Sequence, residues 1–442
     1  MKQPAFVHGH TIQRVATIGC VLLYSLSFMA NSSPIGVEAL RGDINRALIS
    51  GNLAAIDTLA TQHPEVPQVV FDVARARIRY DLEASSTDAK LCEAALESSE
   101  PKIAFYCARL FAGNLRLEGK LREAAREELN IAQRYAEKLS SKDLANPDLA
   151  HANDLIDLPL MTKQIPGETF SVPLLRDRKG HMTTRLNVDD VNVNFIVDTA
   201  AYTILSAETA KAVHAHVVQE EDGTAYGASG YGAKKKLAIV DTLKIGEATL
   251  HNLPVAVADI GIDVVGLDVL RFVAPVRVSK NAMRFYPGGR SAPECDQALT
   301  IGAPPWGANP QLISYQMVNG DRHSMALDTG SIFFLTGTKR AESFANGPPV
   351  QIQMGDLTAR SRTAVYLPGS GTLTLAGVEH ALSFMILPAY DLNYDFLIGN
   401  RALDEVDFFI DFDHRHFCVI GNEAKRAAES AVRTVMDIQR IR

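Results

Sequence analysis

Two short stretches of the chain repeat one unusual pattern, and this repetition constrains the fold more than any other feature of the sequence. Residues 195–206 read FIVDTAAYTILS, and residues 325–336 read MALDTGSIFFLT. In each, an apolar segment typical of a buried strand runs directly into Asp-Thr and a small residue. Each Asp is followed eight residues later by a hydroxyl-bearing residue, Ser206 in the first stretch and Thr336 in the second.

The two halves stay alike beyond these turns. Four features follow each Asp at similar distances: a hydroxyl-bearing residue, a hairpin centred on glycine, a Gly after two apolar residues, and a closing aromatic strand. They fall at Ser206, Gly246, Gly266 and Phe285 in the first half and at Thr336, Gly377, Gly399 and Phe417 in the second. Earlier hairpins are expected around Asp189-Asp190 and Asn319-Gly320. A lone Asp-Thr-Gly arises by chance in about one chain of this length in ten, but two copies with the same sequel predict a duplicated β lobe.

In these residues the chain resembles the aspartic proteases, in the two-lobed single-chain arrangement of pepsin, and each lobe is nearer in length to a retroviral protease subunit. The resemblance covers about 168–422. It implies a bilobal all-β acid-protease fold with lobe 1 at 168–290 and lobe 2 at 298–422. The two Asp-Thr turns would meet at a pseudo-twofold axis.

The resemblance implies that Asp198 and Asp328 are the catalytic pair of an aspartic endopeptidase, whose substrate is a protein or peptide. Two carboxylates about 3 Å apart cannot both ionise, so they share one proton. Such a pair can activate a water molecule as a base and protonate a leaving amine as an acid. This chemistry uses no metal ion and no cofactor, and we expect neither.

The same resemblance gives supporting roles to neighbouring residues. Thr199 and Thr329 would hydrogen-bond across the axis and lock the two loops together. Gly266 and Gly399 would let a neighbouring strand pass close behind each loop, where a Cβ would clash. A flap that closes over the substrate is expected at 221–236, EDGTAYGASGYGAKKK.

Within that segment the flap residues would be Tyr226 and Gly227, and the alternative is a flexible surface loop with a scattered tyrosine.

Two positions in the turns differ from a symmetric pattern. Ala200 stands where the family usually has Gly, and Ser331 carries a hydroxyl where the first half has Ala201. A hydroxyl that hydrogen-bonds a carboxylate favours its charged form, so we expect the residue beside Ser331 to be the more acidic of the pair. We also expect an optimum towards weakly acidic or neutral pH.

The substitution at position 200 keeps a second interpretation open. If its Cβ disables the pair, the chain would be a non-catalytic peptide-binding protein with a degenerate aspartic protease fold. A third interpretation is a helical scaffold that carries a purely structural β domain.

A helical region precedes the lobes, so the chain as a whole is predicted to be a multi-domain α + β protein. In residues 36–140 apolar side chains recur at three- and four-residue spacing, which predicts an α-helical hairpin domain. The small residues of 106–136 are spaced as in a tetratricopeptide helix pair, so the domain would serve packing or linkage, or bind a partner protein. Residues 141–167 are expected to be a linker, and 423–442 a C-terminal helix.

The N-terminus predicts the compartment. Residues 1–33 combine basic residues, the uncharged apolar run 15–30 and a small-residue exit, typical of a signal peptide. The run is shorter than the about 20 residues that usually span a bilayer, although an uncleaved signal anchor that tethers the protein stays open. A secreted or periplasmic protein is expected.

The net charge of −7 without a basic run argues against a nucleic-acid partner.

The cysteines do not form a metal-binding pattern. No CxxC or Cys/His spacing occurs, so a zinc site is not expected. Cys92 and Cys107 fall on consecutive expected helices and would form either a disulfide or two buried thiols.

Overall fold

The structure is a computed structural model that describes residues 36–140, 144, 152–220, 224–226, 232–289, 292–355 and 361–421. The expected signal segment 1–33 and C-terminal helix 423–442 lie outside the described residues, as does Gly227. Within the described part, no helix is both long and apolar enough to cross a membrane.

The N-terminal domain is helical, as expected. Its helices are α2 (Val37–Ser50), α3 (Leu53–Gln62), α4 (Gln68–Ile78), α5 (Leu82–Leu96), α6 (Pro101–Leu117) and α7 (Leu121–Tyr135). The Asn52 and Asp81 side chains accept hydrogen bonds from the first-turn N–H groups of α3 and α5, and Pro101 begins α6, where its missing N–H is not needed. The apolar faces of these helices form one buried core.

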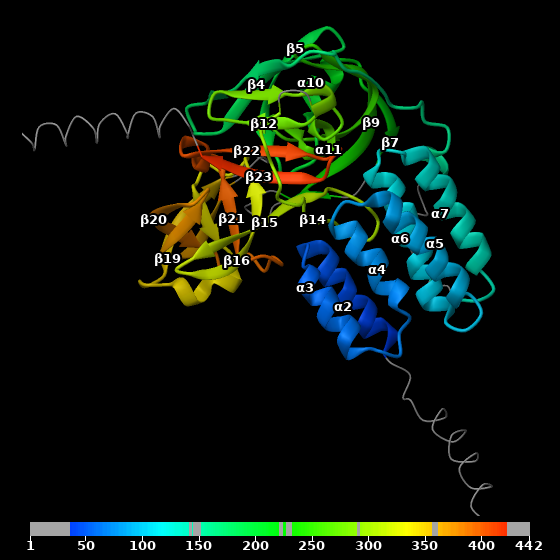
Figure 1. The fold of residues 1–442 in the computed structure, drawn as a ribbon. Helices are drawn as coiled ribbons and strands as arrows, with labels where there is room; N and C mark the ends of the chain where they lie inside the picture. Colours follow the sequence, from blue (N-terminus) through cyan, green and yellow to red (C-terminus); the bar gives the residue numbers. More distant parts are fainter. Residues whose placement is uncertain are drawn as a thin grey trace, which may run out of the picture.

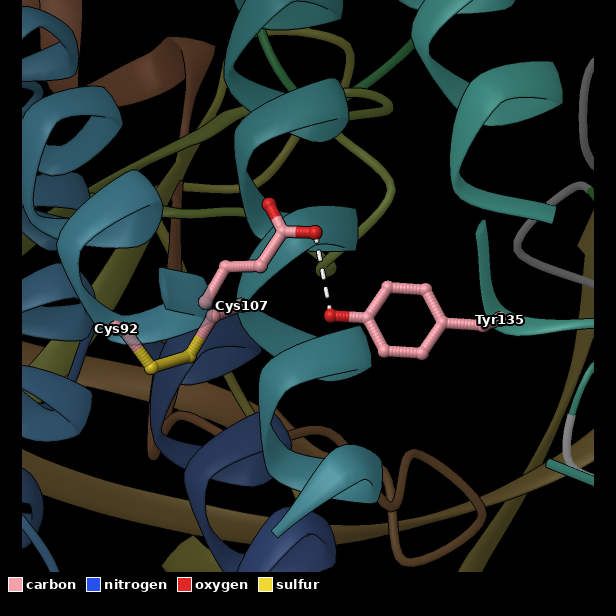
Figure 2. The surroundings of a disulfide bond; sticks show 4 residues. Cys92, Cys107 and Tyr135 are labelled. Atoms are coloured by element: carbon pink, nitrogen blue, oxygen red, sulfur yellow. Dashed lines mark hydrogen bonds between the residues drawn. A yellow bond between two sulfur atoms is a disulfide. The ribbon is translucent and has the colours of Figure 1, made fainter. Parts of the chain in front are cut away.

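A disulfide joins two of these helices. Cys92 of α5 and Cys107 of α6 are bonded, so the disulfide is the alternative that the structure adopts. Figure 2 shows this bond beside Tyr135 of α7, whose hydroxyl is hydrogen-bonded to Glu93 at 3.2 Å. The bond therefore lies where α5, α6 and α7 come together.

Lobe 1 is a closed barrel. Around it run β4 (Met182–Val188), β5 (Val191–Asp198), β11 (Asp263–Gly266), β6 (Ile204–Ser206), β10 (Ala248–Ala258) and β9 (Gly232–Ile245), with β9 returning to pair with β4. The pairings of β5 with β11 and of β6 with β10 are parallel. The interior carries the alternating apolar residues of these strands.

Lobe 2 repeats this plan strand for strand. The order is β15 (Gln311–Val318), β16 (Asp321–Asp328), β21 (Phe396–Gly399), β17 (Leu335–Gly337), β20 (Val378–Ile386) and β19 (Ser361–Leu375), which pairs again with β15. The parallel pairings recur between β16 and β21 and between β17 and β20. The β region thus has the bilobal architecture of the pepsin-like fold, as expected from the repeated turns.

The turns between paired strands follow their sequence signals. Asp189 and Asp190 have positive φ in the β4–β5 turn, and Asn319 and Gly320 do in the β15–β16 turn. Two adjacent residues with positive φ make the tight turn that suits the twist of a hairpin. Both expected hairpins are confirmed, and so are those centred on Gly246 and Gly377.

A further sheet joins the two lobes. Its order is β2 (Phe170–Pro173), β13 (Ala282–Phe285), β12 (Val276–Val278), β22 (Val406–Asp411) and β23 (His416–Gly421). In Figure 1, β22 and β23 (red) run between the green lobe 1 and the yellow-to-orange lobe 2. The antiparallel pairing of β12 with β22 connects the halves, and a disulfide that the sequence did not predict, Cys295–Cys418, ties the segment between the lobes to β23.

The short strands at the edges of these sheets are β1 (Thr162–Gln164), β3 (Leu175–Arg176), β7 (His216–Gln219), β8 (Thr224–Tyr226), β14 (Ile301–Gly302) and β18 (Val350–Gly355). The short helices of the β region are α10 (Ala207–Ala212), α11 (Leu267–Leu270), η1 (Pro287–Gly289), η2 (Lys339–Phe344) and η3 (Asn400–Asp404).

The interval 141–167 is more than the linker that its composition indicated. Strand β1 lies within it and pairs with β10 of lobe 1. Leu155 and Leu158 are buried in an apolar cluster with Ala125 of α7 and Ile239 of β9. The second half of this interval therefore packs between the helical domain and lobe 1.

Candidate active site

The two Asp-Thr turns occupy equivalent places in the two barrels. Strand β5 ends at Asp198 and β16 ends at Asp328. In the parallel registers, Asp198 lies opposite Gly266 and Asp328 opposite Gly399. Each carboxylate is thus carried by a strand that its own barrel holds on both sides.

The threonines of the two turns are hydrogen-bonded to one another in a reciprocal arrangement. Thr199 Oγ1 donates to the carbonyl oxygen of Leu327 at 2.9 Å, and Thr329 Oγ1 donates to that of Val197 at 2.8 Å. Each threonine N–H donates to the other threonine's Oγ1 at 3.1 Å. Both residues are fully buried, so water does not compete for these bonds. This network brings the ends of β5 and β16 together.

The carboxyl groups of Asp198 and Asp328 lie within hydrogen-bonding reach of each other. The Ala200 N–H donates to Asp198 Oδ1 at 2.8 Å, and the Ser331 N–H donates to Asp328 Oδ1 at 3.0 Å. Asp198 is 8 % exposed, and Asp328 is partly buried. The two groups are placed to share a proton.

Burial raises the pKa of both carboxyl groups. For Asp328, burial and the charge of Asp198 raise the pKa to about 8. For Asp198, burial also raises the pKa, but the N–H groups of Ala200 and Ala201 and the bond from Asp328 act in the opposite direction. Asp328 is therefore the member that holds the proton, and Asp198 is the member that carries the charge.

This order of acidity contradicts the one expected from Ser331. The expectation was that the Ser331 hydroxyl makes Asp328 the more acidic residue. The bond that Ser331 gives to Asp328 comes from its backbone N–H, and Ala200 gives Asp198 the same kind of bond. With this contribution matched in both halves, the pKa of Asp328 is raised further by the charge of Asp198, because the second of two neighbouring carboxyl groups must ionise beside the charge of the first.

The glycines around the turns leave space that a side chain would fill. A Cβ on Gly266 would lie 2.2 Å from the carbonyl oxygen of Ala201, and one on Gly399 would lie 2.2 Å from that of Phe333. A Cβ on Gly330 would lie 2.2 Å from Asp198 Oδ2. Any side chain at these positions would clash with a backbone carbonyl oxygen or with the Asp198 carboxylate, so only glycine permits these close contacts.

A β-hairpin lies beside the first turn, in the segment expected to be the flap. Strand β8 pairs with the start of β9, with Tyr226 opposite Gly232. Ala233, next along β9, packs in an apolar cluster with Ala201 and Tyr202, directly after the Asp-Thr turn. The base of the hairpin thus adjoins the Asp198 loop, while Gly227 lies outside the described residues.

Two features of the site were not found from the sequence. Thr203 accepts a hydrogen bond from the N–H of Gly266 at 3.0 Å and donates one to Asp268 Oδ1 at 2.9 Å, which braces the first turn from behind. The position of Asp268, two residues after Gly266, was a usable signal. The Asn309 side chain donates to the carbonyl oxygen of Ala200 at 3.0 Å, and no local sequence pattern marks this residue.

In the described ranges, no group of three or more His, Cys, Asp or Glu side chains could hold a metal ion.

Comparison with known proteins finds similarity to aspartic proteases. Residues 184–269, which include Asp198 and Gly266, match the family model described as aspartyl protease. A retropepsin-like aspartic protease from Rickettsia conorii is 24% identical, covering 27% of this chain and 100% of its own, with a TM-score of 0.24. The aspartic proteinase from Irpex lacteus is 13% identical, covering 58% and 98%, with a TM-score of 0.36.

Basic 7S globulin from soybean is 10% identical over 58% of this chain and 95% of its own, with a TM-score of 0.34. A search of curated proteins found no significant match to the chain. Through the family match of its first lobe and the paired Asp-Thr turns of both, the chain resembles the retropepsin-like and pepsin-like aspartic proteases.

Proposed function

We propose that this protein is an aspartic endopeptidase that hydrolyses peptide bonds with a water molecule activated by Asp198 and Asp328. The observation that carries the proposal is the contact between these two carboxyl groups, held by the reciprocal threonine bonds. A structural role alone would not require two buried carboxyl groups to face one another, because that arrangement costs stability.

In the first step, the charged Asp198 removes a proton from the bound water, and the resulting hydroxide forms a bond to the carbonyl carbon of the substrate. Asp328 gives its proton to the carbonyl oxygen, so the intermediate is a neutral gem-diol. The raised pKa of Asp328, about 8, keeps this proton available at neutral pH.

In the second step, Asp198 passes the proton it gained to the leaving nitrogen while the carbon–nitrogen bond breaks. Asp328 takes a proton from one hydroxyl of the gem-diol, which becomes the new carboxylic acid. The pair then returns to its starting state, with the proton on Asp328 and the charge on Asp198. No metal ion enters this sequence of steps.

The substrate would be a protein or peptide bound in an extended conformation. The β8–β9 hairpin beside the Asp198 loop supplies backbone groups that can pair with such a chain. Tyr226 and Gly227 are proposed as the flap residues that close over it and exclude water.

We expect the substitutions Asp198→Asn and Asp328→Asn each to lower kcat by about 10²- to 10⁴-fold, because each removes one proton-transfer group. Casein cleavage by purified protein measures the effect, and a pepstatin-type inhibitor should block the wild type. Circular dichroism of both variants checks that the lobes remain folded. Equal cleavage by the wild type and both variants would exclude catalysis by this pair.

One observation favours a second function. Ala200 carries a Cβ at the position where lobe 2 has Gly330, and a Cβ on Gly330 would press against Asp198. If Ala200 disables the pair, the chain is a non-catalytic peptide-binding protein. It would then bind unfolded casein without cleaving it, and Asp198→Asn would not change the affinity.

We further propose that the protein works in an oxidising compartment, secreted or periplasmic. The disulfides Cys92–Cys107 and Cys295–Cys418 support this, because such bonds persist outside the cytosol. A membrane tether through residues 15–30 and a partner protein bound by the helical domain stay predictions from the sequence. Mass determination of the mature N-terminus tests the tether.

A further inference from the structure

A side chain from outside both barrels holds the loop that carries Asp198. Asn309 lies between β14 and β15, and its Nδ2 donates to the carbonyl oxygen of Ala200 at 3.0 Å. The N–H of the same Ala200 donates to Asp198 Oδ1 at 2.8 Å. Ala200 is therefore hydrogen-bonded through its carbonyl oxygen to Asn309 and through its N–H to Asp198. The position of the Ala200 N–H depends on both bonds.

The conformation of Asn309 suits this contact. Its φ is +37°, in the left-handed region where asparagine is among the few residues tolerated. Its Oδ1 is buried and has no hydrogen-bond partner within the described residues. A buried acceptor without a partner lowers the stability of the folded state, so Asn309 is not explained by stability alone. The interaction that its side chain does make is the hydrogen bond from Nδ2 to the carbonyl oxygen of Ala200.

The segment before Asn309 is fixed by the helical domain through Arg77. Arg77, on α4, is 1 % exposed. Its Nη2 donates to the carbonyl oxygens of Pro304 and Pro305 at 2.7 and 3.0 Å, and its Nη1 donates to that of Leu110 on α6 at 3.1 Å. A buried guanidinium needs such acceptors, and here they come from α6 and from the segment that leads to Asn309.

Close backbone contacts hold the same segment against α6. A Cβ on Gly113 of α6 would lie 1.9 Å from the carbonyl oxygen of Pro305, and one on Gly307 would lie 2.0 Å from the carbonyl oxygen of Gly113. The absence of side chains at both glycines lets the two backbones touch. Residues 304–307 are thus held by hydrogen bonds and by packing, two residues before Asn309.

We propose that Asn309 is a positioning residue for the Asp198–Asp328 pair, and that the helical domain determines its placement through Arg77. This inference rests on the proposed function. The path runs from α4 and α6 through 304–307 to Asn309, then to Ala200 and the N–H that faces Asp198. The contact also restrains the turn at the position where the first lobe has alanine instead of glycine.

The first test is the substitution Asn309→Gly, which keeps the positive φ and removes the amide. We expect kcat to fall about 3- to 10-fold, as for the loss of one hydrogen bond, with KM within about twofold. The acid limb of the kcat/KM profile should move to higher pH, because the Ala200 N–H favours the charged form of Asp198. The other ionisable groups that act on Asp198 are Asp328 and His181, and the substitution alters neither.

Asn252 offers a matched control. It also has a positive φ, of +51°, and its Nδ2 also donates to a backbone carbonyl, that of Leu160, at 3.0 Å. This contact lies at the exposed edge of lobe 1. The Asn252→Gly protein should therefore keep the wild-type kcat and pH profile. An equal change in both variants would show a general effect of the substitution and overturn the proposal.

The link to the helical domain is tested with Arg77→Lys, which keeps the charge and loses the forked geometry. Alone it should lower kcat by a similar factor, whereas in the Asn309→Gly background it should cause no further loss. Independent, multiplicative losses in the double variant would overturn the path through Asn309.

Hydrogen–deuterium exchange separates this inference from the proposed function, because it does not require activity. In Asn309→Gly and in Arg77→Lys, amides of 195–206 should exchange faster, while those of 378–386 in β20 of lobe 2 should not change. If the wild type does not cleave casein but exchange changes in this way, the proposed function fails and the positioning role stands. If the wild type cleaves and neither kcat nor exchange changes in Asn309→Gly, the positioning role is overturned.

Discussion

At the scale of the residue, the pair of carboxyl groups is asymmetric although the turns that carry it are alike. The threonine bonds are reciprocal, and each Asp accepts a bond from a backbone N–H of its own turn. The pKa of Asp328 is the higher one because this group ionises beside the charge of Asp198. The sequence could identify Asp198 and Asp328, but it could not rank their pKa values. The presence of Ser331 does not show whether its hydroxyl or its backbone N–H donates the hydrogen bond to Asp328.

The pH dependence of activity follows from these pKa shifts. The proposed mechanism needs one proton on the pair, and this proton is lost as the pH rises through the pKa of Asp328, about 8. On the acid side, activity is lost as Asp198 takes up a proton, at a pH above the ordinary value for Asp because its pKa is raised. We therefore expect a bell-shaped kcat/KM profile with its maximum between weakly acidic and neutral pH. A maximum below about pH 3, where pepsin's dyad is still active, would contradict this assignment.

The same shifts predict a trend in stability. A carboxyl group with a raised pKa binds more protons in the folded than in the unfolded state, so stability falls as the pH rises from the unfolded value of Asp towards about 8. The Asp328→Asn protein lacks this group and should show a smaller fall in Tm over that range.

At the scale of the element, strands and hairpins were the most predictable part of the molecule. The Asp189-Asp190 and Asn319-Gly320 turns fix the register of β4 with β5 and of β15 with β16. Contacts between elements were harder to predict. Strand β1 hydrogen-bonds β10 through backbone groups, and its three exposed residues carry no apolar alternation. The disulfide Cys295–Cys418 likewise joins residues far apart in the sequence.

The threonine network gives a prediction for the two loops as elements. Thr199→Val removes the donor to Leu327 and the acceptor for the Thr329 N–H, leaving buried groups without partners. We expect the free energy of unfolding to fall by about 2–4 kcal/mol. Thr199→Ser keeps both bonds and loses one methyl group, which costs about 1 kcal/mol. Urea unfolding compares them, and a Val variant as stable as the Ser variant would show that the network contributes little.

At the scale of the whole molecule, the helical domain contacts both lobes and the sheet that joins them. The backbone at Gly119 packs on Phe272 of lobe 1, and the backbone at Gly302 of β14 packs on Ile49 of α2. The Tyr80 ring meets Phe412, between β22 and β23, edge to face. The sequence predicted the domain but not its docking, because contacts made by glycines and carbonyl oxygens leave no pattern in the side chains.

These contacts predict the result of removing the helices. Residues 152–442 produced alone would expose Phe272, Phe412 and Ile239 and lose the contacts of Arg77. We expect this fragment to aggregate or to melt at least about 5–10 °C below the full chain, since each kcal/mol of lost stability lowers Tm by about 2–4 °C in a domain of this size. It should also be less active.

The outcome decides whether the helices act as a removable pro-region. A soluble fragment with activity higher than that of the full chain would contradict an integral role for the helical domain. Addition of purified residues 36–140 to the fragment should restore part of the activity if the docking is as described.

The pairing of β12 with β22 limits how the two lobes can move relative to each other. Arg277 lies opposite Phe409 in this ladder, and a slip by one residue would turn every side chain of the strand to the wrong face. Sliding of one half along the other is therefore blocked. The relative motion that remains to the two halves is a rotation about this pairing.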